Sequence, residues 1–141
     1  MSLTLHDTHA WSRDDFDWPN VIAAIETFVA PFPNDATVES VIKDVIVGKS
    51  RLWLVRDEGA RTVAIVLVTI TNVDATGWRR ATITGYGGTR GIEALPMIAE
   101  IEQWAREQGA DEIEIFGRKG WRRLLGPLGY AEAAVILRKG L

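Results

Sequence analysis

The densest group of side chains able to bind a ligand is a basic stretch near the C-terminus, GRKGWRRLLGPLGY, from Gly117 to Tyr130. Arginine grips phosphate through two parallel hydrogen bonds, so the cations of this stretch could hold a phosphorylated ligand. They could equally be the solvated face of a short helix that buries Trp121, Leu124 and Leu125. The cations are Arg118, Lys119, Arg122 and Arg123.

The overall charge argues against a nucleic-acid surface. The net charge is −3, although residues 118–141 carry six Lys/Arg and only one Glu. This asymmetry favours a local anion site. The basic run is also short and is not interleaved with a series of aromatic residues, as single-strand binders are. We therefore expect no nucleic-acid partner.

Several other chemistries are excluded by residue type. The chain contains no cysteine, which rules out a thiolate nucleophile, a disulfide and a zinc–sulfur site. The only histidines are His6 and His9, and a separation of three places them on opposite faces of a strand. We therefore expect no metal site.

Candidates for proton transfer are few. Tyr86 follows a β-rich segment and is a candidate general acid, although it could also be a packed aromatic residue with its hydroxyl at the surface. Tyr130 is expected to begin the last strand. Asp14, Asp15 and Asp17 are candidate bases, but helix capping and solvation explain them equally well.

The bulk properties are those of one globular domain over residues 1–141. Hydrophobic residues make up 47% and charged residues 25% of the chain. No apolar run approaches the length of a membrane span, and the N-terminus lacks a basic region followed by an apolar one. We expect an intracellular product without a membrane partner.

Apolar periodicity predicts the elements that must position these residues. Period-3.6 patterns predict helices over residues 15–30, 35–48, 92–109 and 119–129. Alternating or β-branched segments predict strands over residues 3–11, 50–57, 62–73, 78–88, 111–117 and 130–141. The strands before and after the helix at 92–109 should be parallel neighbours if the crossover is normal. The predicted class is α+β, a mostly antiparallel sheet with one parallel βαβ crossover and helices on both faces.

This pattern resembles the GCN5-related N-acetyltransferase (GNAT) superfamily over nearly the whole chain. The segments VIVGKSRLWLV, MIAEIEQWAREQGADEIEIFGRKGW and LGYAEAAVILRKGL are similar to small acetyltransferase-like proteins of tailed phages and prophages. The resemblance implies acetyl-CoA as cofactor, with backbone groups of the strand before the long helix contacting the pantetheine arm. The loop and helix N-terminus that follow would bind the pyrophosphate.

Carried onto this sequence, the resemblance implies a cofactor-binding segment in the strand and its glycine-rich end, with one arginine from the late helix. The implied residues are Thr82, Ile83, Thr84, Gly85, Gly87, Gly88, Thr89, Arg90, Gly91 and Arg118. Arg90 would contact the phosphates. The implied acid is Tyr86, and no metal is implied.

Two parts of the family pattern are not matched. The pyrophosphate loop of the family would place its key residues at Thr89, Ile92 and Ala94, of which only Ala94 is compatible. Glu93 in the first helical turn would repel a pyrophosphate, and Pro96 has no N–H to donate. These departures also allow a different interpretation, a glycine-rich turn before a helix that caps itself.

The late helix departs as well. The position that usually holds the acidic tyrosine is Leu125, which cannot donate a proton. Arg118 stands where asparagine is usual, and Trp121 stands where a small residue is common. An open split between the two parallel strands would favour a cofactor site, whereas a cleft filled by Trp121 or Leu125 would favour a structural role.

Three functional hypotheses follow. The first is an acetyl-CoA-dependent N-acetyltransferase with a degenerate cofactor loop and an unknown amine acceptor. The second is a non-catalytic phage virion or host-interaction protein that keeps the GNAT fold, with phage structural proteins or a second copy as partners. Such a protein would be made in the host cytoplasm and could be packaged in the particle. The third is a small nucleotide- or RNA-binding module that uses the basic C-terminal stretch.

Overall fold

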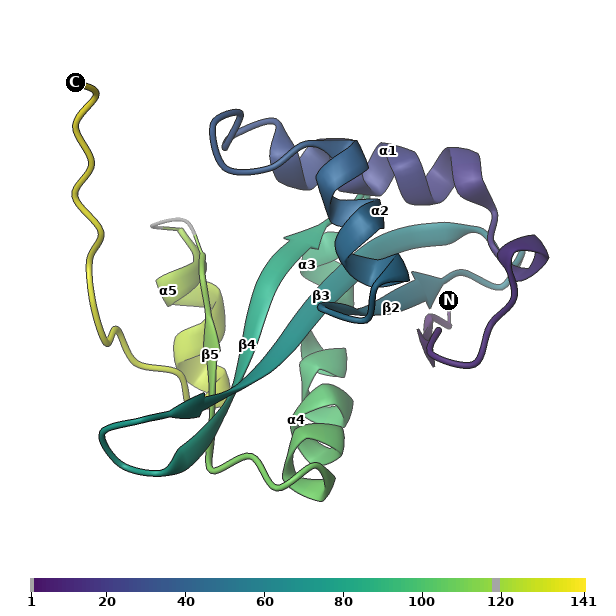
Figure 1. The fold of residues 1–141 in the computed structure, drawn as a ribbon. Coiled ribbons are helices and arrows are strands. Elements are labelled where there is room, and N and C mark those ends of the chain that lie inside the picture. The colour runs from purple at the N-terminus through teal and green to yellow at the C-terminus, as the bar shows by residue number, and fades with distance from the viewer. Residues whose placement is uncertain (1, 118–119) are drawn as a thin grey trace.

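The computed structural model describes residues 2–117 and 120–141. Within these residues, one sheet has the strand order β1-β2-β3-β4-β5, and only β4 and β5 pair in parallel (Figure 1). The strands are β1 (Thr4–Asp7), β2 (Arg51–Arg56), β3 (Thr62–Val73), β4 (Trp78–Gly87) and β5 (Glu112–Ile115). The helices are α1 (Trp18–Val29), α2 (Val38–Ile46), α3 (Gly91–Ala94), α4 (Ile98–Glu107) and α5 (Trp121–Leu125), with 3₁₀ turns η1 (Arg13–Asp15), η2 (Leu95–Met97) and η3 (Gly126–Leu128).

Helices cover both faces of the sheet, which confirms the predicted class. Alternate residues of the central strands belong to different clusters: Leu52 and Leu54 of β2 pack under α1 and α2. Trp53, between them, joins the cluster beneath α4 and α5. The central strands are buried on both faces because helices lie above and below them, so β2 and the first half of β3 are almost continuously apolar.

Asp17 connects α1 to the sheet in a way that the sequence did not reveal. It occupies the N-cap position of α1, but its carboxylate makes no capping bond. Instead it accepts hydrogen bonds from the backbone N–H (2.7 Å) and hydroxyl (2.6 Å) of Thr62 in β3, and from Arg56 Nη2 (3.0 Å). Burial alone would raise the pKa of Asp17, but the bonds from Thr62 and Asn20 outweigh it and lower the pKa to about 2.

The helix predicted over residues 92–109 is instead a succession of α3, η2 and α4. Pro96 lies inside η2 and cannot donate the hydrogen bond that a continuous α-helix would require. The predicted end is confirmed, since Gly109 has a φ of +83° just beyond α4.

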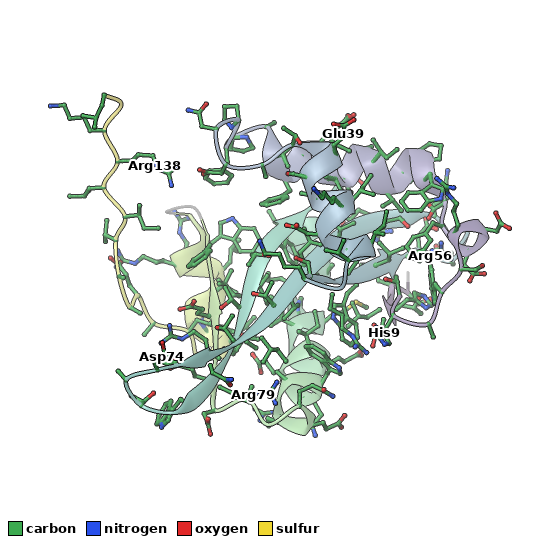
Figure 2. The ribbon with its side chains drawn as sticks, viewed as in Figure 1. His9, Glu39, Arg56, Asp74, Arg79 and Arg138 are labelled. Atoms are coloured by element: carbon green, nitrogen blue, oxygen red, sulfur yellow. The ribbon has the colours of Figure 1, made fainter. Side chains whose placement is uncertain are left out.

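The closing strand predicted over residues 130–141 is wrong. Within the described residues this segment, called here the C-terminal tail, has no strand structure, and Val135, Ile136 and Leu137 are exposed. Ion pairs hold the tail to other elements: Arg138 contacts Asp35 (2.9 Å), and Glu132 in the tail contacts α5. Figures 1 and 2 show the tail, with Arg138, running apart from the sheet. High β-propensity yields a strand only where the segment fits onto a sheet.

No helix in the described part of the chain is both long enough and apolar enough to cross a membrane.

Candidate functional site

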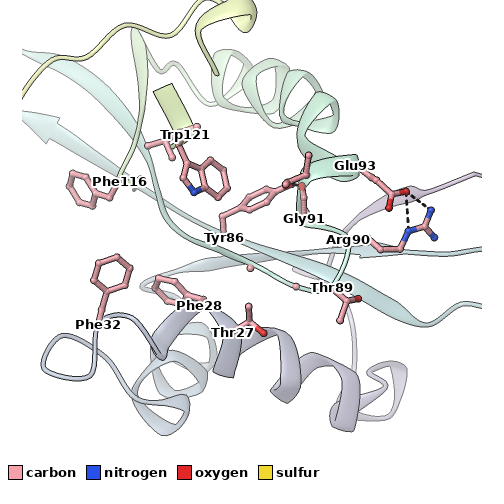
Figure 3. Close-up of a pocket in the computed structure, with 15 residues that line it drawn as sticks. Thr27, Phe28, Phe32, Tyr86, Thr89, Arg90, Gly91, Glu93, Phe116 and Trp121 are labelled. Atoms are coloured by element: carbon pink, nitrogen blue, oxygen red, sulfur yellow. Dashed lines mark hydrogen bonds and ion pairs between the residues drawn. The ribbon is translucent and has the colours of Figure 1, made fainter. Parts of the chain in front are cut away.

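The two parallel strands separate part-way along their length. Pairing between β4 and β5 runs from Arg80 to Ile83, and the last bond across it joins the Phe116 N–H to the Ile83 carbonyl oxygen (3.3 Å). Beyond that point β4 continues to Gly87 while pairing with β3, and the described residues of β5 give it no partner. A cleft of about 420 Å³ opens there between the ends of the two strands (Figure 3).

A bulge in β4 determines which side chains face the cleft. Ile83 pairs with Val68 and Gly85 pairs with Leu67. Thr84 is therefore an extra residue with no paired residue in β3. The bulge reverses the alternation of side chains along the strand. As a result Tyr86, like Ile83, packs with the α4 and α5 cluster, although regular alternation would put it under α1.

The glycines at the end of β4 are required by packing within the protein. A Cβ on Gly85 would lie 2.8 Å from Leu67 Cδ1 and 2.9 Å from the ring of Phe28. A Cβ on Gly87 would lie 2.9 Å from the Ala24 carbonyl oxygen of α1. These distances are shorter than real Cβ contacts, so α1 can approach β4 this closely only because no side chain intervenes.

Gly88 is the most constrained of the glycines. Its φ is +140°, and a Cβ there would lie 2.3 Å from the Val63 carbonyl oxygen and 2.5 Å from Ala64 Cα. The same carbonyl accepts a hydrogen bond from the Arg90 N–H (3.1 Å). The turn after β4 is therefore fixed against the backbone of β3.

Tyr86 lies in the cleft wall with its hydroxyl engaged. Its ring meets Trp121 edge-on, with centroids 4.9 Å apart, and its hydroxyl donates to the Gly91 carbonyl oxygen (2.6 Å). Burial raises the pKa of this phenol, so it is protonated at neutral pH. The ring is packed, as the alternative interpretation expected, but its hydroxyl is bonded to the Gly91 carbonyl oxygen in a part-buried position.

The loop from Thr89 to Glu93 forms the polar end of the cleft. Arg90 Nη2 lies 2.6 Å from Glu93 Oε2, and Arg90 Nε lies 3.1 Å from the same oxygen (Figure 3). This hydrogen bond is the main cause of a lowered pKa at Glu93. The guanidinium that the resemblance assigned to phosphate therefore already binds a carboxylate from the first turn of α3.

The opposite end of the cleft is aromatic. Phe32 comes from the segment between α1 and α2, and Phe116 follows β5; both line the cleft and both are exposed, by 38% and 61% respectively. Phe28 of α1 packs against Gly85 and Gly87 of β4 and lies beside Phe32 in the cleft (Figure 3). Sequence reasoning missed these three residues. The available signal was a large apolar side chain at a break, in PFPND and in IFG.

The fold has close counterparts among solved structures, whereas no family model and no curated protein sequence matches the chain. A transcriptional regulator from Bacillus halodurans superposes with a TM-score of 0.74 at 17% identity, covering 99% of this chain and all of that one. A GNAT family acetyltransferase from Staphylococcus aureus gives 0.67 at 12% identity, covering 100% of both chains. An aminoglycoside 6'-N-acetyltransferase from Acinetobacter baumannii gives 0.68 at 15%, covering 99% of both.

The chain has the GNAT acetyltransferase fold. Leu125, at the tyrosine position implied by the family, is 6% exposed and packs in the α4 and α5 cluster. Trp121 lines the cleft as part of its wall. The split in this GNAT fold is thus open at the end of β4, and Leu125 contributes to the core beneath it.

The segment that the resemblance assigned to the cofactor divides into two parts in this GNAT fold. Gly87, Gly88, Thr89, Arg90 and Gly91 line the cleft together with Tyr86. The remaining residues do not line it: Ile83 is buried, Thr84 forms the bulge, Gly85 packs on Phe28, and the buried Thr82 hydroxyl donates to Glu114 (3.0 Å). Arg118 lies outside the described residues.

The other polar candidates lie apart from the cleft. Neither histidine lines it, and His6 forms a hydrogen bond with Thr4 (2.8 Å). Asp14 and Asp15 lie in η1, before α1, and also do not line it. Among the described residues, no group of three or more His, Asp or Glu side chains could hold a metal ion.

Proposed function

We propose that this protein is an acyl-CoA-dependent N-acetyltransferase, with its reaction centre in the cleft between β4 and β5. One observation carries the proposal. The outer backbone edge of β4 beyond Ile83 has no strand partner in the described residues and faces an open cleft. An extended ligand that contains amide groups can pair with such an edge as an added strand would.

An acyl-CoA fits this cleft at two places. Its pantetheine arm carries amides that suit the unpaired edge near Gly87, and the cleft leaves room beside that edge. Its phosphates would meet the loop at Thr89, Arg90 and Gly91. There Arg90 would have to exchange Glu93 for phosphate, which makes this loop the weaker half of the site.

A bound acyl-CoA would supply a thioester, whose acyl carbon bonds to the acceptor nitrogen as the carbon–sulfur bond breaks. The nitrogen loses one proton and the sulfur gains one. Burial raises the pKa of Tyr86, so its phenol is protonated at neutral pH but is a weak acid, and it donates to the Gly91 carbonyl oxygen. Delivery of this proton to the sulfur would require that bond to break, and water would then return a proton to the phenolate. Glu93 is the sole carboxylate among the described cleft residues, and its bond to Arg90 lowers its pKa. The first proton therefore passes to water.

The second candidate function is a non-catalytic protein that keeps the fold for assembly. It is favoured by the buried Leu125 at the position of the usual acid and by the exposed apolar residues of the C-terminal tail. Phage structural proteins or a second copy of this chain would be its partners, in a host cell or in a particle. Gene neighbours and proteomics of purified particles would test the phage origin.

Calorimetry with acetyl-CoA tests the proposal. We expect micromolar binding by the wild type, several-fold tighter binding by Glu93→Gln, which releases Arg90, and at least tenfold weaker binding by Arg90→Glu. Arg13→Glu, at an exposed site in η1, makes the same charge change away from the cleft and should bind as the wild type does. If millimolar acetyl-CoA gives neither a heat of binding nor a shift in melting temperature, the proposal is wrong and the non-catalytic candidate is favoured.

A further inference from the structure

The proposed function does not explain why one end of the cleft is lined by aromatic side chains. Five aromatic residues line this one cleft: Phe28, Phe32, Tyr86, Phe116 and Trp121. Tyr86 and Trp121 support each other by an edge-on contact, and Phe28 is pressed against Gly85 of β4. These three rings are therefore accounted for by packing.

Phe32 and Phe116 are not accounted for in that way. Both are exposed, and neither ring makes an aromatic contact among the described residues. Figure 3 shows them on opposite sides of the cleft mouth, one beside α1 and the other after β5. Exposed phenyl rings forgo the stabilisation that burial would give, and two rings on opposite sides of an opening can recover part of it by enclosing a third group.

The charges in the cleft lie at its other end. Arg90 and Glu93 are the only charged residues among the described ones that line it, and they are paired with each other. Asp35 lies three residues from Phe32, but both of its carboxylate oxygens are 2.9 Å from Arg138 Nη1. A polycationic acceptor would find no free carboxylate at the aromatic end, whereas a flat apolar group would find two rings.

The volume limits the size of the acceptor. A cleft of about 420 Å³ lies near the lower end of the range for small-molecule sites, roughly 300–1,000 Å³. Under the proposed function this space is shared with the end of the pantetheine arm, which leaves room for a small amine.

We infer that the acceptor is a small primary amine bearing a flat aromatic group, which lies between Phe32 and Phe116. This inference rests on the proposed acetyltransferase function. The two rings act as the specificity-determining residues, and the amine extends from between them toward Tyr86 and the end of β4.

The test compares acceptors in the presence of saturating acetyl-CoA, following release of free CoA thiol and the mass of the product. We expect kcat/KM for 2-phenylethylamine to exceed that for ethylamine, spermidine and kanamycin at least about tenfold. The double variant Phe32→Leu/Phe116→Leu should lower kcat/KM for 2-phenylethylamine about tenfold and leave that for ethylamine within about twofold. Trp78→Leu, which replaces an exposed ring at the start of β4 that does not line the cleft, should change neither.

Binding gives a second readout that is independent of turnover. Ligand-observed NMR with CoA present should detect 2-phenylethylamine on the wild type, and the signal should be lost in the double variant. Preference for spermidine or kanamycin, or no detectable binding of 2-phenylethylamine, overturns the inference while the acetyltransferase proposal stands. The absence of acetyl-CoA binding in the calorimetry instead overturns the proposed function itself, so the two failures are distinguishable.

Discussion

The two walls of the cleft are built in different ways. The β4 wall comprises β4, the turn to Gly91 and α1; it is paired along its length with β3 and packed so closely that side chains are excluded at Gly85, Gly87 and Gly88. The β5 wall comprises β5, the segment through Phe116, α5 and the tail. It has one short parallel pairing and ends in exposed residues.

Because of this difference, we expect the β4 wall to be rigid and the β5 wall to be adaptable. A wall fixed by backbone contacts can hold a reacting group to within a fraction of an ångström, whereas a wall with exposed side chains such as Phe116 can adjust to ligands of several shapes. Substitutions in the β4 wall should therefore reduce stability, and substitutions in the β5 wall should mainly change selectivity. The following variants test that contrast in order of decreasing effect.

Gly88→Ala should have the largest effect. The new Cβ would collide with the backbone of Val63 and Ala64, which cannot rotate away, at a φ that L-residues rarely adopt. We expect a loss of at least about 3 kcal/mol in the free energy of unfolding. Urea unfolding measures it. Gly120→Ala in the β5 wall, where a Cβ would meet nothing within 4 Å, should be close to neutral. Similar losses in both variants would contradict the contrast between the walls.

Asp17→Asn should remove a pH-dependent part of the stability. The pKa of Asp17 is about 2 in the folded protein against an ordinary 3.8, so its contribution is present above about pH 4 and is lost as the pH falls toward 2. The carboxylate is 23% exposed, and we expect its share to be about 2 kcal/mol at neutral pH.

Stability measured by urea titration at several pH values between 2 and 6 checks this prediction. The variant should show a shallower fall in that window than the wild type. Asp14→Asn, which changes an exposed carboxylate that makes no hydrogen bond among the described residues, is the matched control. If the free energy of unfolding of Asp17→Asn depends on pH as that of the wild type does, the hydrogen bonds between Asp17 and Thr62 do not contribute to stability.

Tyr86→Phe should cost about 1 kcal/mol of stability, because the Gly91 carbonyl loses its donor. If Tyr86 protonates the sulfur, kcat should fall by about 10²-fold or more while binding of acetyl-CoA changes little. Calorimetry and steady-state rates separate the two effects. A variant with full activity would remove Tyr86 from the mechanism and leave it as a packing residue of the β4 wall.

Removal of residues 131–141 should have the smallest effect. It breaks the exposed ion pairs of Glu132 and Arg138, each worth well under about 1 kcal/mol, and retains Tyr130, whose hydroxyl donates to Glu102 (2.6 Å). The melting temperature should move by no more than about 2–3 °C. A much larger fall would mean that the tail pairs as a strand in solution, and the β5 wall would then be as firmly built as the β4 wall.

Some of this architecture follows from sequence alone because it depends on pattern. The apolar runs of β2 and β3 and the 3.6-residue period of α1 and α4 are imposed by burial, and the parallel crossover follows from chain connectivity. Three features could not be predicted from the sequence. They are the ion pair between Arg90 and Glu93, the hydrogen bonds from Thr62 to Asp17, and the position of Phe32 across the cleft from Phe116. Each depends on how closely two segments approach each other in the folded chain, and a local sequence pattern carries no information on that distance.

The C-terminal tail is a case in which a local sequence pattern gave the wrong prediction. The tail contains Val135 and Ile136, which favour strands, and the sequence predicted a strand there, but the tail does not pair with the outer edge of β5, which has no partner among the described residues. In the structure, charges at Glu132 and Arg138 attach the tail elsewhere. The predicted strand is wrong because the local preference of a few residues did not decide the structure of the tail.

The bulge at Thr84 lets β4 carry one extra residue without exchanging the faces of the side chains that flank it. Substitution of Thr84 leaves the count intact, so Tyr86 keeps its place beside Trp121. Deletion of Thr84 would leave Ile83, Gly85 and Tyr86 consecutive, so regular alternation would keep Tyr86 on the face of Ile83 and the neighbouring glycines on the face of α1. A one-residue gap at this point would therefore preserve the faces of the cleft residues, whereas flattening the bulge with Thr84 retained would turn Tyr86 toward α1.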